Sequence, residues 1–282
     1  MAQQVPVDRS ARADEIDNDS VHEVAPDIAY QRHLLVNVVF CGLPGAGDRG
    51  WVLIDAGVYG SAPRIIKAAA NRFGAEARPA AIVMTHGHFD HVGALRELAE
   101  LWDVPVFAHG LEHPFLNGSA SYPPPDSKTG GGVLARLSPL YPRGPIDVSR
   151  WLRNLPDTGK VPDMPGWRWI YTPGHTQGHV SLWRESDRTL IAGDALITTA
   201  QESAYAVMTQ KLELHGPPMY YTEDWEMARQ SVEELRELEP ELLITGHGRA
   251  MQGQELRDAL DVLADNFHEI AVPEHRRHAG RF

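Results

Sequence analysis

Short apolar runs recur along this chain, and several of them end directly before a histidine or an aspartate. Several of the runs lack a strict alternation of apolar and polar residues, which is typical of strands whose sheet is covered on both faces. Glycine, proline or charged residues bound them, as expected for turns. The strand-like runs span residues 36–41, 51–56, 80–85, 104–108, 167–171, 179–183, 189–194 and 242–246.

Amphipathic helical patterns lie between these runs. Residues 62–73 and 92–101 fill two of the intervals, and residues 224–238 fill a third before Pro240, which cannot continue a helix. A fourth pattern repeats apolar residues at helical spacing over residues 256–267. Strand-like and helical segments that alternate in this way predict an α/β fold.

The length and composition suit one large α/β domain. The chain has 282 residues, of which 43% are hydrophobic, so it can bury a full core. We expect a polar N-terminal segment over residues 1–20, a domain over residues 21–270 and a C-terminal tail over residues 271–282.

One internal segment, residues 110–166, interrupts the alternation of strands and helices. It is rich in proline and glycine, includes the stretch YPPPDSKTGGG, and is too long for a plain connector. We expect either a lid over a functional site, which would select the substrate, or an ordered surface insertion.

Charge and hydropathy exclude several classes of partner. The formal net charge is −12 at pH 7, and lysine and arginine cluster only in the short tail HRRHAGR. We therefore expect a small-molecule substrate and no nucleic acid. The N-terminus lacks the apolar core of a secretory signal, and no stretch reaches the roughly 18 apolar residues of a membrane span. These features predict a cytoplasmic protein that does not bind membranes; they leave its oligomeric state open.

The densest group of metal-binding side chains follows the apolar run at residues 80–84. The sequence THGHFDHVG places His86, His88, Asp90 and His91 within six positions. His86 and His88 alternate on an extended segment and can face one ion, while Asp90 and His91 are offered to a neighbouring ion. Cys41 is the only cysteine, so a metal here depends on histidine and carboxylate ligands.

Three further candidate ligands follow strand-like runs downstream. They are His175 in YTPGHTQGH, Asp194 in LIAGDAL and His247 in LLITGHG, each preceded by a small residue. Ligands at strand ends are held by a rigid sheet and can meet at one of its edges. The sequence therefore predicts a metal site of two neighbouring ions.

With these motifs the chain resembles the metallo-β-lactamase superfamily, from about Val21 to about Phe267. The resemblance implies a four-layer αββα sandwich with the metals at one edge of the sheets. It also implies that His86, His88 and His175 bind one metal, that Asp90, His91 and His247 bind the second, and that Asp194 bridges them. Asp55, in LIDAG, is expected either to orient ligands or to form the turn at the end of its strand.

The residue at the bridging position indicates which branches of the superfamily the chain resembles. True β-lactamases usually carry Cys or Ser where Asp194 stands, so the chain looks more like glyoxalase II, lactonases and related hydrolases. It departs from quorum-signal lactonases because Ile197 replaces their tyrosine, and the basic glutathione-binding residues of glyoxalase II are not identifiable.

The expected chemistry is hydrolysis of an ester, lactone or thioester. Two divalent ions that share a water lower its pKa from about 15.7 toward 7, which supplies a bridging hydroxide as the nucleophile. Asp90 is the catalytic residue that we expect to accept and return the proton. Zinc suits this ligand set best, with iron or manganese as alternatives. Two other functions stay open: a mononuclear iron enzyme resembling persulfide dioxygenases, and a binding protein without catalysis.

For the remaining histidines and for three tyrosines, we expect structural roles first. His179 is expected to support the turn that carries His175, because only the first histidine of this motif is a ligand in the family. His109, His113 and His215 are expected on the surface or in loops, with access to substrate as the alternative. Tyr205, Tyr220 and Tyr221 could donate to a developing oxyanion, although packing is the simpler role for each.

Overall fold

The computed structural model describes residues 5–6, 21–126, 144, 146–199 and 213–277. The chain forms two compact units. We call Asp14–Pro123 with Pro142–Trp169 the N-terminal unit, and Met1–Ala13, Pro124–Tyr141 and Ile170–Phe282 the C-terminal unit. Residues 1–4 and 7–20 of the predicted N-terminal segment and residues 278–282 of the predicted tail lie outside the described residues.

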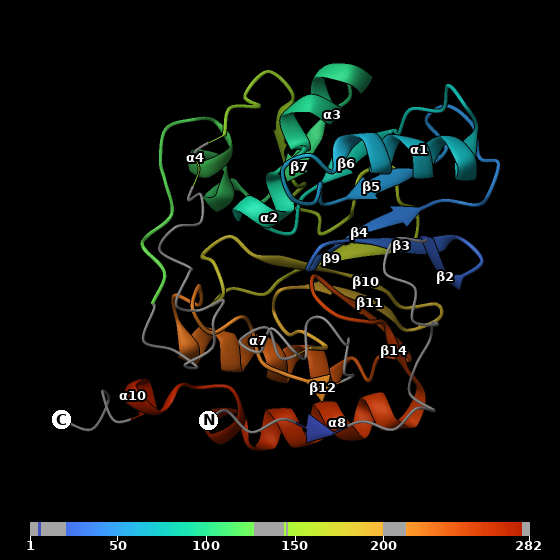
Figure 1. Cartoon of the computed structure of the whole chain (residues 1–282). Helices are drawn as coiled ribbons and strands as arrows, with labels where there is room; N and C mark the ends of the chain where they lie inside the picture. Colours follow the sequence, from blue (N-terminus) through green and yellow to red (C-terminus); the bar gives the residue numbers. More distant parts are fainter. Residues whose placement is uncertain (1–4, 7–20, 127–143, 145, 200–212, 278–282) are drawn as a thin grey trace. The chain divides into compact units, whose positions relative to one another are not determined.

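The N-terminal unit contains a seven-stranded sheet in the order of the sequence (Figure 1). The first four strands pair antiparallel, and β5 to β8 pair parallel. The strands are β2 (Val21–Ala25), β3 (Ile28–His33), β4 (Val36–Cys41), β5 (Val52–Ile54), β6 (Ala81–Val83), β7 (Val106–Ala108) and β8 (Leu152–Asn154).

Helices α1 (Ala62–Phe73) and α3 (Leu95–Trp102) lie on one face of this sheet (Figure 1). Pro63 stands in the first turn of α1, where its missing N–H costs no hydrogen bond. Under the helices, the Trp51 ring stacks on Phe73 at 4.4 Å and meets the edge of Trp102 at 5.7 Å. The unit also contains α2 (Phe89–Val92), the 3₁₀ helix η2 (Gly110–Glu112) and α4 (His113–Leu116).

A five-stranded sheet in the order β14, β13, β11, β10, β9 belongs to the C-terminal unit, except for residues 167–169 of β9. Strand β11 pairs antiparallel with β10 and parallel with β13, and β13 pairs antiparallel with β14. The strands are β9 (Trp167–Tyr171), β10 (Val180–Arg184), β11 (Thr189–Gly193), β13 (Leu242–Thr245) and β14 (Met251–Gln252). A separate two-stranded sheet pairs β1 (Val5–Pro6) with β12 (Glu213–Leu214).

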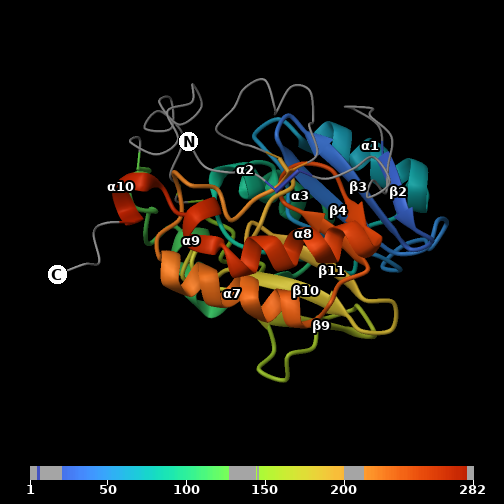
Figure 2. The same ribbon diagram turned by 90° about the horizontal axis from the view of Figure 1, so that it is seen from below.

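Helices α7 (Trp225–Glu237) and α8 (Gly253–Asp265) run side by side beneath this sheet (Figures 1 and 2). The Asp224 side chain caps α7 by accepting hydrogen bonds from the N–H groups of Glu226 and Met227, both at 3.0 Å. Val232 and Leu260 belong to the apolar core of the unit. Two short helices, α9 (Phe267–Ile270) and α10 (Glu274–Arg277), follow α8.

The apolar patterns of the sequence predicted most of the longer strands and helices. All eight strand-like runs contain strands, and all four helical patterns contain helices, with ends that differ by a few residues. Strands β1, β2, β3, β8, β12 and β14 were not predicted. Strand β3 escaped prediction because it buries the polar residues Gln31, Arg32 and His33 beside its apolar ones. No helix among the described residues is long and apolar enough to cross a membrane.

The segment at residues 110–166 contributes regular structure where it is described. It contains η2, α4 and β8, and β8 extends the sheet by pairing parallel with β7. Residues 127–143 and 145, which include most of YPPPDSKTGGG, lie outside the described residues. At least its two ends are therefore part of the N-terminal unit.

We predict that Trp51→Ala lowers the free energy of unfolding by about 3–5 kcal/mol, because it leaves a cavity between Phe73 and Trp102. Urea unfolding followed by circular dichroism measures this change. Leu101→Ala is the control, since Leu101 is 57% exposed and should change the free energy by less than about 0.5 kcal/mol. Equal shifts in the two variants would contradict the assignment of Trp51 to the core.

Candidate metal centre

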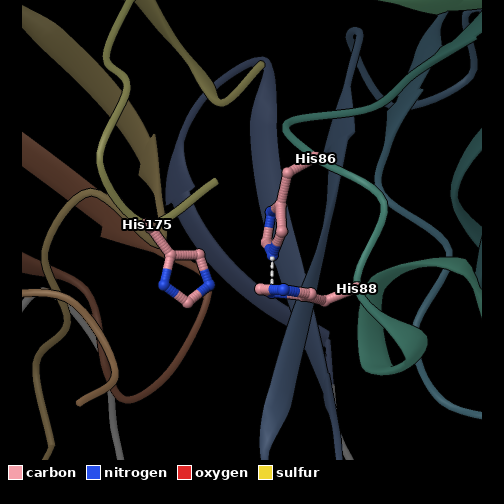
Figure 3. Close-up of side chains that lie close together, drawn as sticks. All are labelled: His86, His88 and His175. Atoms are coloured by element: carbon pink, nitrogen blue, oxygen red, sulfur yellow. Dashed lines mark hydrogen bonds between the residues drawn. The ribbon is translucent and has the colours of Figure 1, made fainter. Parts of the chain in front are cut away.

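Four of the predicted ligands lie in the N-terminal unit, directly after β6. The chain leaves the strand through Thr85 and His86, and α2 begins after His88, which has an extended backbone conformation. His86 Nε2 and His88 Nδ1 lie 3.0 Å apart within hydrogen-bonding distance (Figure 3). Both rings are buried, as are Asp90 and His91 on α2. The local fold thus holds four ligand groups with little freedom to move.

Asp55 fixes this segment from the end of β5. Its Oδ2 atom lies 2.8 Å from His91 Nδ1 and accepts a hydrogen bond of 2.8 Å from the Thr85 hydroxyl, while Oδ1 accepts one from the Thr85 N–H. A bond from Nδ1 leaves Nε2 as the coordinating nitrogen of His91. Asp55 also has a positive φ of 60°, so it both forms the turn and orients His91.

The other three predicted ligands lie in the C-terminal unit, each beyond the end of a strand. His175 follows β9, Asp194 follows β11 and His247 follows β13. Asp194 Oδ2 lies 3.1 Å from His247 Nε2 and 3.5 Å from His175 Nε2. All three side chains are buried. One carboxylate oxygen therefore stands within reach of two imidazole nitrogens.

Two uncharged residues, His179 and Thr222, orient these ligands through hydrogen bonds. His179 Nε2 accepts a hydrogen bond of 2.9 Å from the Asp194 N–H, and its Nδ1 lies 3.1 Å from the Thr172 carbonyl oxygen, to which it donates. His179 thus has the supporting role expected from the sequence. The Thr222 hydroxyl donates to the Pro218 carbonyl and lies 3.3 Å from His175 Nδ1, which directs His175 Nε2 toward Asp194.

The donor set fits divalent metal ions. Zinc–nitrogen bonds of about 2.0–2.1 Å place tetrahedral ligand atoms roughly 3.3 Å apart, close to the 3.0 Å between the His86 and His88 nitrogens. The described residues include buried His and Asp groups that could hold a metal ion, and these groups contain all seven predicted ligands.

The structure corrects the expectation for one of the other histidines. His215 is 3% exposed and lies in a bridge with Ile197, so it is neither a surface nor a loop residue. Burial lowers its pKa to about 4. His109 is half-buried, and burial also lowers its pKa, while its ring accepts a bond from the Leu111 N–H. The proline and glycine neighbours of His215 suggested a loop and gave no sign of burial.

Two of the three tyrosines have the packing role that was the simpler expectation. Tyr220 and Tyr221 are buried, and their rings meet edge to face at 5.1 Å, so both contribute to packing. Tyr205 lies outside the described residues.

Two residues near the ligands were missed in the sequence. Glu112 and Tyr122 contact the backbone of Gly87, between the first two histidines. They belong to the segment at residues 110–166, whose composition resembles a loop. No spacing relates them to the ligand motif, so only the tertiary structure reveals the contact.

Comparison with known proteins agrees with this geometry. The family model of the metallo-beta-lactamase superfamily matches residues 34–247. The chain is 50% identical over 238 residues to the probable metallo-hydrolase YflN of Bacillus subtilis, covering 84% of this chain and 89% of that protein. It is 25% identical to the hydroxyacylglutathione hydrolase GloC of Haemophilus influenzae, covering 62% and 71%. Among solved structures, TTHA1623 in a di-iron-bound form is 24% identical with a TM-score of 0.55, covering 83% of this chain and 95% of that one.

The chain belongs to the metallo-β-lactamase superfamily. This confirms the predicted α/β fold class, the four-layer αββα sandwich, and places the chain among the metal-dependent hydrolases of the superfamily.

We predict that Asp55→Asn weakens metal binding about 10-fold, within the range for losing a partner that orients a ligand. The amide carries no charge and cannot accept all three hydrogen bonds that Asp55 receives from Thr85 and His91. Competition with a chromophoric chelator measures the affinity. Asp48→Asn is the matched control, because Asp48 pairs with Arg78 at an exposed site. If the two variants bind metal with equal affinity, Asp55 does not contribute to metal binding and only forms the turn.

We predict that His215 makes the protein less stable in acid. Its pKa is about 4 in the folded state and about 6.5 in the unfolded state, so the unfolded state binds more protons between these values. The contribution of His215 to the free energy of unfolding is therefore fully present above pH 6.5. The free energy of unfolding falls by about 3 kcal/mol as the pH drops toward 4. Urea unfolding of wild type and His215→Leu across this range should show a shallower decline in the variant. Parallel pH profiles would disprove it.

Proposed function

We propose that this enzyme is a dinuclear metal-dependent hydrolase that cleaves an ester, lactone or thioester of a small molecule. In the proposed site, one ion is held by His86, His88 and His175, and the second by Asp90, His91 and His247. Asp194 bridges the two ions.

The placement of Asp194 is the observation that carries this proposal. Its Oδ2 atom is within 3.5 Å of one imidazole nitrogen from each proposed ion, His175 Nε2 and His247 Nε2. A carboxylate between two ligands of different ions is what a bridge requires. Two close dications repel strongly, and a shared anionic ligand offsets that repulsion.

The ligands of the N-terminal unit support the same site. His86 and His88 present their ring nitrogens to each other, and His91 is oriented by Asp55. The match to the family extends over residues 34–247, which include all seven proposed ligands.

Bound divalent ions would supply an acidified water and a positive charge for the developing anion. The protein contributes the orientation of the ligands and a group for proton transfer. Asp90 is 8% exposed at the beginning of α2, and we assign it to accept a proton from the attacking water and to return it to the leaving group.

The substrate class rests on the bridging residue and on the relatives. Asp194 stands where the family's true β-lactamases usually carry Cys or Ser. The Haemophilus influenzae relative is a hydroxyacylglutathione hydrolase by name, and a hydroxyacyl group on glutathione is a thioester. The net charge of −12 favours a small-molecule substrate over nucleic acid. Zinc suits the histidine and carboxylate ligands best, and iron and manganese are the alternatives.

The experiment combines metal analysis with a substrate panel. Wild type and Asp194→Ala are loaded with metal, dialysed, and assayed on lactones, thioesters, phosphodiesters and β-lactams. Wild type should retain two ions per chain and hydrolyse lactones or thioesters. Asp194→Ala should lose metal at both positions, and its activity should fall by more than the roughly 10- to 100-fold that follows loss of a partner orienting a ligand. Its pH of half-maximal activity should rise, because the remaining water is less acidic.

Asp187→Ala is the matched control for that experiment. Asp187 lies in the same unit and pairs with Arg184 near the surface, so its removal should leave metal content and activity unchanged. An Asp194→Ala protein with two ions and near-native hydrolysis would contradict the dinuclear site. A wild type with one iron per chain that consumes oxygen with glutathione persulfide would replace the hydrolase by an oxidoreductase.

A further inference from the structure

The peptide that joins His86 to His88 is held by two residues from a later segment of the N-terminal unit. The Gly87 N–H donates to Glu112 Oε2 at 2.9 Å and to the Tyr122 hydroxyl oxygen at 3.0 Å. The Tyr122 hydroxyl in turn donates to Glu112 Oε2. One amide, one hydroxyl and one carboxylate thus form a closed triangle of hydrogen bonds, which we call the Gly87 clamp.

The clamp is buried and packs against one of the ligands. Glu112 is fully buried and Tyr122 is 2% exposed. The Tyr122 ring lies between two other rings, with its centroid 4.4 Å from that of His88 and 3.8 Å from that of Phe115, on which it stacks. A buried carboxylate is costly unless it receives hydrogen bonds, so Glu112 ties the Gly87 N–H and the Tyr122 hydroxyl firmly in place.

Gly87 itself shows how closely the clamp fits. A Cβ atom added there would lie 2.8 Å from the Tyr122 hydroxyl oxygen, 3.3 Å from Glu112 Oε2 and 3.3 Å from Leu116 Cδ2. The φ of Gly87 is not positive, so the backbone conformation does not demand glycine. Glycine is required instead because the side chains of the clamp leave no space for a Cβ atom at this position. The backbone of Gly87 and the clamp are therefore in close steric contact.

We propose that Glu112 and Tyr122 are positioning residues of the metal site, which hold the Gly87 peptide so that His86 and His88 face one ion. Gly87 is the sole link between the two histidines, so a rotation of its peptide would separate the ring nitrogens that now lie 3.0 Å apart. Tyr122 adds a direct restraint on the His88 ring.

This inference rests on the proposed metal site, yet the clamp is defined by contacts within the N-terminal unit alone. It gives the first part of the segment at residues 110–166 a role distinct from that of a substrate lid. Residues 112 and 122 act on the ligands, whatever the rest of the segment contacts.

The test compares Tyr122→Phe with wild type in two measurements. Phenylalanine keeps the ring between His88 and Phe115 and removes only the hydroxyl. We expect the affinity for Zn²⁺, measured by competition with a chelator, to fall about 10-fold for one of the two ions. In the metal-free protein we expect hydrogen exchange of the Gly87 amide, followed by NMR, to accelerate about 10-fold. Gly87→Ala, which displaces the clamp from the other side, should weaken binding of the same ion.

Tyr59→Phe is the matched control, because the Tyr59 side chain is 94% exposed in the same unit and should change neither measurement. A Tyr122→Phe protein with wild-type zinc affinity would overturn the proposed role. Unchanged exchange at Gly87 would overturn the clamp itself. If wild type binds no metal while Gly87 exchange still accelerates in Tyr122→Phe, the proposed function fails and, with it, the role of the clamp in metal binding.

Discussion

Parallel strand pairing determines where the polar residues of the site lie. In the N-terminal unit, Ile54 on β5 is in register with Val83 on β6, so the residues that follow both strands emerge side by side. The Asp55 N–H then donates to the Val83 carbonyl oxygen at 2.9 Å, and the Asp55 carboxylate reaches Thr85. Because the register is fixed by a ladder of backbone hydrogen bonds, Asp55 and the histidine segment keep their spacing without any metal.

The same constraint operates independently in the C-terminal unit. Gly193 on β11 is paired with Thr245 on β13, and the Gly246 N–H donates to the Gly193 carbonyl oxygen at 2.8 Å. Asp194 and His247, which are 53 residues apart in sequence, therefore lie at the ends of adjacent strands. Their 3.1 Å contact follows from this register together with the support that His179 gives to the Asp194 N–H.

The sequence was most informative where chemistry and local pattern coincide. The crowding of His86, His88, Asp90 and His91 after an apolar run predicted a metal site, because four such residues rarely occur within six positions by chance. Helix α1, which has a clear apolar stripe, was also predicted with its observed bounds. Buried polar strands carry no such stripe, which is why β3 was missed.

Contacts between distant segments could not be predicted in the same way. Whether Asp55 forms a turn or orients a ligand depends on its distance from His91, and the answer is both. Glu112, Tyr122 and Thr222 have ordinary neighbours in sequence, and their roles arise from the residues that the fold brings next to them. His215 looked like a loop residue because its neighbours are glycine and proline, whereas its own environment is the interior.

The contact of Tyr122 with Gly87 also sets a limit for engineering by loop exchange. A chimera that took the whole segment from a relative would exchange the restraint on the histidines together with any surface that meets the substrate. A junction placed after Pro123 would leave Glu112 and Tyr122 in their native context. The part of the segment that acts on the histidines therefore ends at the beginning of its proline run, while β8 at the other end remains a strand of the sheet.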